Sequence, residues 1–147
     1  AARGLDALHA RGLVHGDVRP ANLLVDPSGR AVLLDLLSEH APSSPERFAG
    51  TAAYMAPEHG RGEVAGPATD MYSLGVVLFE ALTGELPFVG SGREIFIRKN
   101  TVSAPRPSLL LPRVPSDLDE MTARLLDRRP AARPTAAELV SLLSARA

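Results

Sequence analysis

Polar side chains of the types used in phosphoryl transfer are grouped near the start of the chain. Residues 15–22 read HGDVRPAN, and Asp35 follows eighteen residues after Asp17, at the end of the apolar run 31–34. Phosphoryl transfer needs a carboxylate beside the attacking hydroxyl and oxygen ligands that hold Mg²⁺ against the nucleotide phosphates. Asp17 suits the first task, and Asn22 and Asp35 suit the second. The spacing therefore predicts a phosphoryl-transfer site.

Three further motifs follow in order and make this prediction more specific. Residues 50–58 read GTAAYMAPE, residues 70–84 read DMYSLGVVLFEALTG, and residues 128–134 read RRPAARP. Together with the first motif, they resemble the C-terminal lobe of a bacterial serine/threonine protein kinase of the eukaryotic-like (Hanks) type. The resemblance covers essentially all 147 residues. It implies a mainly α, helical lobe with a small β-hairpin near the catalytic loop.

The resemblance implies roles for the residues of the phosphoryl-transfer motif. Asp17 is similar to the catalytic aspartate that accepts a hydrogen bond from the substrate hydroxyl, and Asn22 and Asp35 are similar to the two Mg²⁺ ligands. Arg19 stands where serine/threonine kinases usually carry a lysine that touches the transferred phosphate. Thr51 matches a threonine that bridges toward the catalytic aspartate. Its Gly-Thr-x-x-Tyr context is typical of kinases that act on serine and threonine hydroxyls.

Other positions match residues with structural roles in the family. Glu58 and Arg133 resemble a buried ion pair, in which removal of one partner would leave an unpaired buried charge. Asp70 resembles an aspartate that bonds the backbone of the catalytic loop. His15, the first residue of the catalytic motif, is also expected to be structural.

Two positions depart from the family pattern. Gly16 replaces the arginine that normally receives an activation-loop phosphate, and residues 35–37 read DLL where the family has Asp-Phe-Gly. The second change removes a glycine that would allow positive φ. Ser43 and Ser44, in the polar loop 38–48, are candidate phosphosites. We nevertheless hypothesise that phosphorylation of this loop is not the main on-switch.

Local patterns predict the elements that must position these residues. A helix is expected to end at Gly12, which is placed to adopt the left-handed conformation. Two short strands, 23–25 and 31–34, are joined by the turn-forming residues 26–29. The run 71–82 is apolar on nearly every face, which predicts a helix buried all round. The hairpin therefore separates the catalytic loop from the second predicted metal ligand.

The second half of the chain is predicted to be helical. Two pairs have capping-box spacing and mark helix N-termini: Ser91 with Glu94, and Thr135 with Glu138. Ser116 is expected to cap a third helix. Lys99, the only lysine in the chain, is expected to be a solvated residue near a helix end.

Composition narrows the possible functions. The chain is 45% hydrophobic with a net charge of −1 and no cysteine. The length and hydrophobic content suit a single domain. The net charge provides no electrostatic basis for nucleic-acid or membrane binding. The lack of cysteine fits a cytoplasmic protein or the cytoplasmic part of a membrane-anchored one. The sequence starts without methionine, inside an apparent amphipathic helix. We therefore expect residues 1–147 to be a partial kinase domain whose N-terminal, ATP-clamping lobe is missing.

The expected activity is ATP- and Mg²⁺-dependent phosphoryl transfer to serine or threonine hydroxyls of protein substrates, performed by the intact kinase and not by this segment alone. Two alternatives stay open. A pseudokinase or truncated lobe would act as a binding platform. A small-molecule phosphotransferase of the aminoglycoside kinase type shares the His-Gly-Asp motif, although such enzymes do not usually carry the motifs at 50–58 and 70–84.

Overall fold

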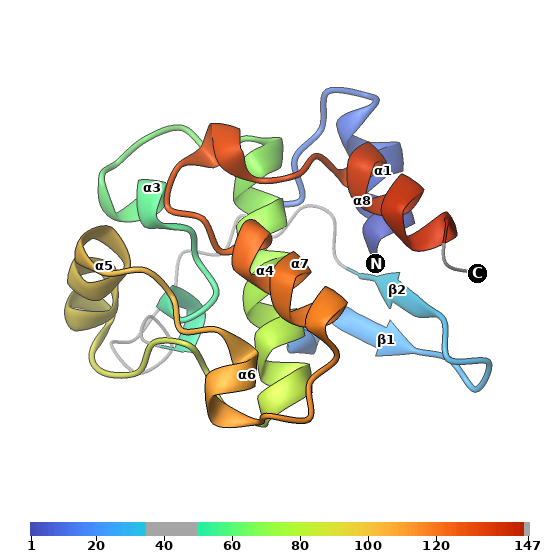
Figure 1. Ribbon diagram of the computed structural model, residues 1–147. Helices are drawn as coiled ribbons and strands as arrows, with labels where there is room; N and C mark the ends of the chain where they lie inside the picture. Colours follow the sequence, from blue (N-terminus) through green and yellow to red (C-terminus); the bar gives the residue numbers. More distant parts are fainter. Residues whose placement is uncertain (35–49, 146–147) are drawn as a thin grey trace.

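The computed structural model describes residues 1–34 and 50–145. These residues are mainly α-helical with one two-stranded antiparallel sheet, which confirms the predicted fold class (Figure 1). In chain order the elements are α1 (Ala2–His9), the 3₁₀ helix η1 (Pro20–Asn22), β1 (Leu23–Val25), β2 (Ala31–Leu33), α3 (Pro57–Gly60), α4 (Pro67–Thr83), α5 (Gly92–Thr101), α6 (Pro107–Leu110), α7 (Ser116–Leu125), the 3₁₀ helix η2 (Pro130–Ala132) and α8 (Ala136–Ser144). Asp35, Ser43 and Ser44 lie outside the described residues.

Helix α4 occupies the centre of the fold (Figure 1). It begins with Pro67, whose missing N–H costs no hydrogen bond in a first helical turn. It ends where Gly84 adopts φ 77° and donates its N–H to the carbonyl of Glu80. The helix is therefore longer than the predicted span 71–82. The additional first turn contains Asp70, which places this carboxylate at the end of the helix nearest the catalytic motif.

One hydrophobic core joins four helices and a loop. It consists of Leu5, Val18, Met71, Met121, Leu125, Ala136 and Leu139. Helix α7 approaches α4 closely because Gly75 has no side chain; a Cβ atom there would lie 2.7 Å from Cβ of Leu125. Val18 is only 1% exposed and belongs to loop 13–19, between α1 and η1. The catalytic motif is thus anchored directly in the core.

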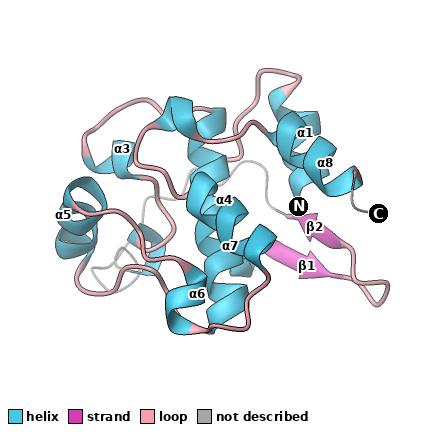
Figure 2. Cartoon of the chain, in the orientation of Figure 1, coloured by secondary structure: helices cyan, strands magenta, loops and turns pink. Residues whose placement is uncertain are grey.

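The hairpin forms as predicted, with a small difference at its end. Leu23 pairs with Leu33, and Val25 pairs with Ala31. Figure 2 shows that, within the described chain, strands occur only in this hairpin. The second strand ends one residue earlier than predicted because Leu34 lies opposite Asn22, which already belongs to η1; the N–H of Leu34 still donates to the carbonyl of Asn22 at 2.9 Å. This bond ties the end of the hairpin to η1.

The predicted helix ends are confirmed in all but one case. Gly12 has φ 70° after α1, and the side chains of Ser91 and Thr135 accept hydrogen bonds from backbone N–H groups at the starts of α5 and α8. The prediction for Ser116 is wrong, because Pro115 takes the N-cap position and Ser116 is the first helical residue. Pro115 has φ −55° and ψ 136°, and this extended ψ is the value expected of a cap residue.

Within residues 1–34 and 50–145, every helix is too short or too polar to cross a bilayer.

Candidate active site

The loop that carries the catalytic motif is held in shape by one buried carboxylate. Asp70 is 1% exposed and accepts hydrogen bonds from the backbone N–H groups of His15 and Gly16, both at 2.8 Å. It also contacts Nε2 of His9 at 2.9 Å. The contact between Asp70 and the loop backbone, expected from the resemblance, is therefore present.

Gly16 adopts φ 77°, and a Cβ atom at this position would meet nothing within 4 Å. The backbone conformation, not the available space, is what favours glycine here. Any side chain would place the residue in the left-handed region at a cost of about 1 kcal/mol. Glycine therefore suits this turn.

His15 links the loop to the end of the hairpin. Its Nε2 lies 2.9 Å from the carbonyl oxygen of Leu34, and its Nδ1 accepts the N–H of Asp17 at 3.3 Å. These partners assign the neutral tautomer that carries its proton on Nε2. His15 is nearly buried, so it fits the structural role expected for it.

Asp17, Arg19, Asn22 and Thr51 are brought together at one place. The amide nitrogen of Asn22 donates to the backbone oxygen of Asp17 at 2.9 Å and to its Oδ2 at 2.8 Å. Nε of Arg19 lies 3.2 Å from the same Oδ2, and its Nη1 donates to the Thr51 hydroxyl at 3.4 Å. The Asp17 side chain is 22% exposed, so its carboxylate is held on one side and open to solvent on the other.

Not every N–H group of the Arg19 guanidinium takes part in a hydrogen bond within the described residues. Its Nε–H is buried and points at no acceptor within the part of the chain that the structure describes, so its contact with Asp17 is an ion pair without a hydrogen bond. Buried polar groups usually have a partner. An oxygen-rich anion bound beside Asp17 would supply one.

The described residues provide oxygen donors of the kind that Mg²⁺ prefers. Both amide protons of Asn22 are directed at Asp17, so its Oδ1 takes no part in those bonds and suits a hard cation. In residues 1–34 and 50–145, no three acidic, histidine or cysteine side chains are arranged so that they could hold a metal ion together. A second carboxylate is predicted at Asp35, outside that range.

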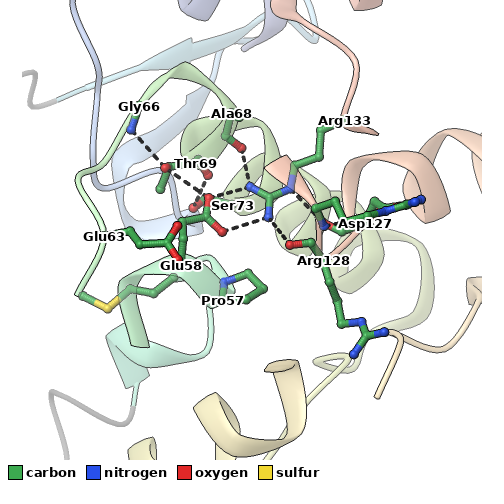
Figure 3. Close-up of polar contacts among 12 residues, drawn as sticks. Pro57, Glu58, Glu63, Gly66, Ala68, Thr69, Ser73, Asp127, Arg128 and Arg133 are labelled. Atoms are coloured by element: carbon green, nitrogen blue, oxygen red, sulfur yellow. Dashed lines mark hydrogen bonds and ion pairs between the residues drawn. The ribbon is translucent and has the colours of Figure 1, made fainter. Parts of the chain in front are cut away.

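The predicted ion pair between Glu58 and Arg133 is present and buried (Figure 3). The guanidinium donates to both carboxylate oxygens, at 2.6 and 2.8 Å, and also to the carbonyls of Ala68 and Asp127. Burial alone would raise the pKa of Glu58, but the hydrogen bonds and charge of Arg133 bring that pKa below its ordinary value. The pair ties α3 to the segment before α8, away from Asp17.

The prediction that Lys99 is solvated is wrong. Instead of being solvated, the side chain is 0% exposed, and Nζ donates to the carbonyls of Ala52, Ala53 and Met55 at 2.9, 2.7 and 2.6 Å. One signal was available in the sequence, because Lys99 lies four residues after the apolar Ile95 and so shares its helix face. Every other Lys or Arg position carries arginine.

Comparisons with known proteins agree with this geometry. The family model described as "Protein kinase domain" matches residues 1–142. Serine/threonine-protein kinase PknA of Mycobacterium tuberculosis is 39% identical over 136 residues, which cover 89% of this chain and 31% of PknA. PknL of the same species is 39% identical over 136 residues, covering 88% of this chain and 34% of that protein. The probable serine/threonine-protein kinase PkwA of Thermomonospora curvata is 40% identical over 146 residues, covering 96% of this chain and 19% of PkwA.

The chain thus spans between 19% and 34% of the length of these relatives. The family match nevertheless extends over almost all of its residues, including the loop of Asp17, helix α4 and the pair of Glu58 with Arg133. The chain therefore belongs to the protein kinase domain family.

Proposed function

We propose that this chain is the C-terminal lobe of a kinase that transfers the γ-phosphoryl group of ATP to serine or threonine hydroxyls of proteins, with Asp17 as the residue that aligns the hydroxyl. The observation that carries the proposal is the state of the Asp17 carboxylate. Asn22 and Arg19 hold its Oδ2, and the side chain is partly open to solvent. A carboxylate held in this way can accept the substrate's hydroxyl proton without changing rotamer.

The neighbouring residues supply the remaining charges. Arg19, steadied by Thr51, would direct its unused Nε–H toward an oxygen of the transferred phosphate. Asn22 would hold Mg²⁺ through Oδ1, together with Asp35 if that residue plays the role its motif indicates. When bound, the metal neutralises the charge of the ATP phosphates.

We propose further that a second lobe clamps the α- and β-phosphates. The lysine that usually performs this task has no counterpart in this chain, because Lys99 is the only lysine and its three N–H donors are occupied by backbone carbonyls. A complete kinase would therefore place ATP between this lobe and a partner lobe. We expect the reaction to take place in the cytoplasm, where ATP is available.

A protein is favoured over a small molecule as the phosphate acceptor. The turn after Thr51 is fastened from two sides, by Lys99 of α5 and by a 2.6 Å hydrogen bond from the Tyr54 hydroxyl to Glu80 of α4. The motifs at 50–58 and 70–84 resemble those of kinases that use this surface to dock protein substrates. A rigid, prearranged segment beside Asp17 suits recognition of an extended polypeptide.

The test is phosphate transfer from radiolabelled ATP to casein by the full-length protein and its Asp17→Asn variant. We expect kcat to fall roughly 10²–10⁴-fold, with an unchanged KM for ATP. Asp26→Asn, in the hairpin turn, is the matched control and should retain full activity. Transfer by Asp17→Asn at the wild-type rate would refute the assignment. Binding of protein partners by a wild-type protein that transfers no phosphate would instead support the binding-platform alternative.

A further inference from the structure

A buried ammonium group connects helix α5 to the turn that follows Thr51. Lys99 reaches from the last turns of α5 and places Nζ among three backbone carbonyls of a four-residue stretch, those of Ala52, Ala53 and Met55. An ammonium has three N–H donors, and each of the three bonds is 2.9 Å or shorter. Figure 1 shows α5 beside α3, close to the start of this stretch.

The same stretch is tied to the catalytic residues at its other end. The carbonyl of Thr51 accepts the N–H groups of Tyr54 and Met55, at 3.0 and 3.3 Å, which makes residues 51–55 one tight turn. The Thr51 hydroxyl accepts a hydrogen bond from Arg19, which in turn contacts Asp17. A short chain of contacts therefore leads from Lys99 to the carboxylate that we assign to the reaction.

Stability alone does not account for a lysine at this position. Removing an ammonium from water is costly, and an apolar side chain of similar length would avoid that cost. Burial lowers the pKa of Lys99 to about 7, although the nearby Glu58 carboxylate opposes this effect. What an apolar side chain cannot do is gather three carbonyl oxygens around one point.

We propose that Lys99 is a positioning residue for the polypeptide substrate: its ammonium holds the 51–55 turn in the shape that presents a docking segment beside Asp17. The inference rests on the proposed function. The carbonyls at 52, 53 and 55 point toward α5, and Ala52 and Ala53 are themselves buried, so the partly exposed residues of the turn, Thr51, Tyr54 and Met55, are left to meet the substrate. Without Lys99, these carbonyls would turn toward water and the docking segment would lose its fixed shape.

A neighbouring residue shows that α5 supports this whole region. Asn100 donates to the carbonyl of Pro57, the first residue of α3, at 3.3 Å. It also accepts from Arg61, which directly follows α3, at 2.6 Å. Phe96 lies against Gly60, where a Cβ atom would come within 2.6 Å of the ring. Lys99 therefore acts at the end of a packed contact between α5 and α3 and not as an isolated tether.

The experiment compares steady-state kinetics of the full-length wild type with those of Lys99→Met, which keeps the length of the side chain and removes its charge and donors. We expect KM for casein to rise about tenfold or more while KM for ATP stays within about twofold. The matched control is Val114→Ala, a truncation of a buried side chain between α6 and α7 that should lower thermal stability and leave both KM values unchanged.

If Lys99→Met does not fold, Lys99→Gln replaces it, because the shorter amide retains two N–H donors; the same split between the two KM values is then expected at smaller size. A KM for casein within about twofold of the wild-type value in the folded variant would overturn the inference. Failure of the proposed function has a different signature, since a wild-type protein without phosphate transfer would contradict the role of Asp17 before any variant is compared.

Discussion

Replacing Arg133 by methionine should be among the most destabilising single changes in this fold. Glu58 is only 3% exposed, and besides two bonds from Arg133 it has a 3.3 Å hydrogen bond from Thr69. The substitution would leave this carboxylate buried without its counter-charge. It would also remove donors to the carbonyls of Ala68 and Asp127 and a cation–π contact 4.9 Å from the ring of Tyr72.

The size of the effect follows from these contacts. Loss of one partner of a buried ion pair costs about 3–5 kcal/mol. With a urea m-value of about 2 kcal/mol per molar, a loss of about 4 kcal/mol moves the unfolding midpoint down by about 2 M. Arg129→Met is the matched control, because that side chain is 80% exposed and pairs with Asp127 at the surface. Its expected cost is small, because exposed ion pairs contribute little to stability.

Urea unfolding of the full-length protein, followed by circular dichroism, measures both variants and completes a double-mutant cycle with Glu58→Leu. The double variant Glu58→Leu/Arg133→Met should lose less stability than the two single losses added together, because no buried charge is left unpaired. If Arg133→Met unfolds at the same urea concentration as Arg129→Met, the reasoning about this pair is refuted.

Two further predictions concern the backbone and the charge of Lys99. Gly16→Ala should lower stability by about 1 kcal/mol because φ is positive there, whereas Gly50→Ala, where φ is not positive and a Cβ atom would meet nothing within 4 Å, should leave stability nearly unchanged; thermal melting separates the two, and equal shifts would contradict the argument. For Lys99 the folded-state pKa of about 7 lies below the ordinary value of 10.5, so between these values folding releases a proton. The free energy of unfolding of the wild type, relative to that of Lys99→Met, should therefore rise with pH across this window by at most about 1.4 kcal/mol per pH unit. As the pH falls through about 7, this gain is lost. Urea unfolding at about pH 7 and about pH 9 tests this, and a difference that does not change with pH would contradict it.

Features set by neighbouring residues were predictable from the sequence. The hairpin follows from two short apolar runs around a turn, and the starts of α5 and α8 follow from capping boxes, because each depends on side chains within a few positions. The ion pair of Glu58 and Arg133 joins distant segments, and only the family motif made it predictable. The direct bond between Asn22 and Asp17 adds a contact that the assignment of Asn22 to the metal did not include.

Features that depend on the packed environment were not predictable. Lysine is rarely buried without a partner, so a helix-end lysine is normally expected in solvent. The position of Lys99 four residues after Ile95 indicates the helix face, but the carbonyls that bind its ammonium belong to a turn more than forty residues earlier, and their direction cannot be read from side-chain types. The prediction for Ser116 was wrong by one position, because α7 already begins at Ser116 and the backbone of Pro115, with ψ 136°, is the last non-helical one.

Val18 couples the loop that carries Asp17 to the hydrophobic core. The residue between Asp17 and Arg19 has its side chain in the core that α1, α4, α7 and α8 share. Loops at active sites commonly open by local fluctuations that leave the rest of a protein folded. Here such an opening would withdraw Val18 from that core and expose apolar surface on four helices. The loop and the core therefore form one cooperative unit, and the carboxylate of Asp17 keeps its place for as long as the lobe itself remains folded.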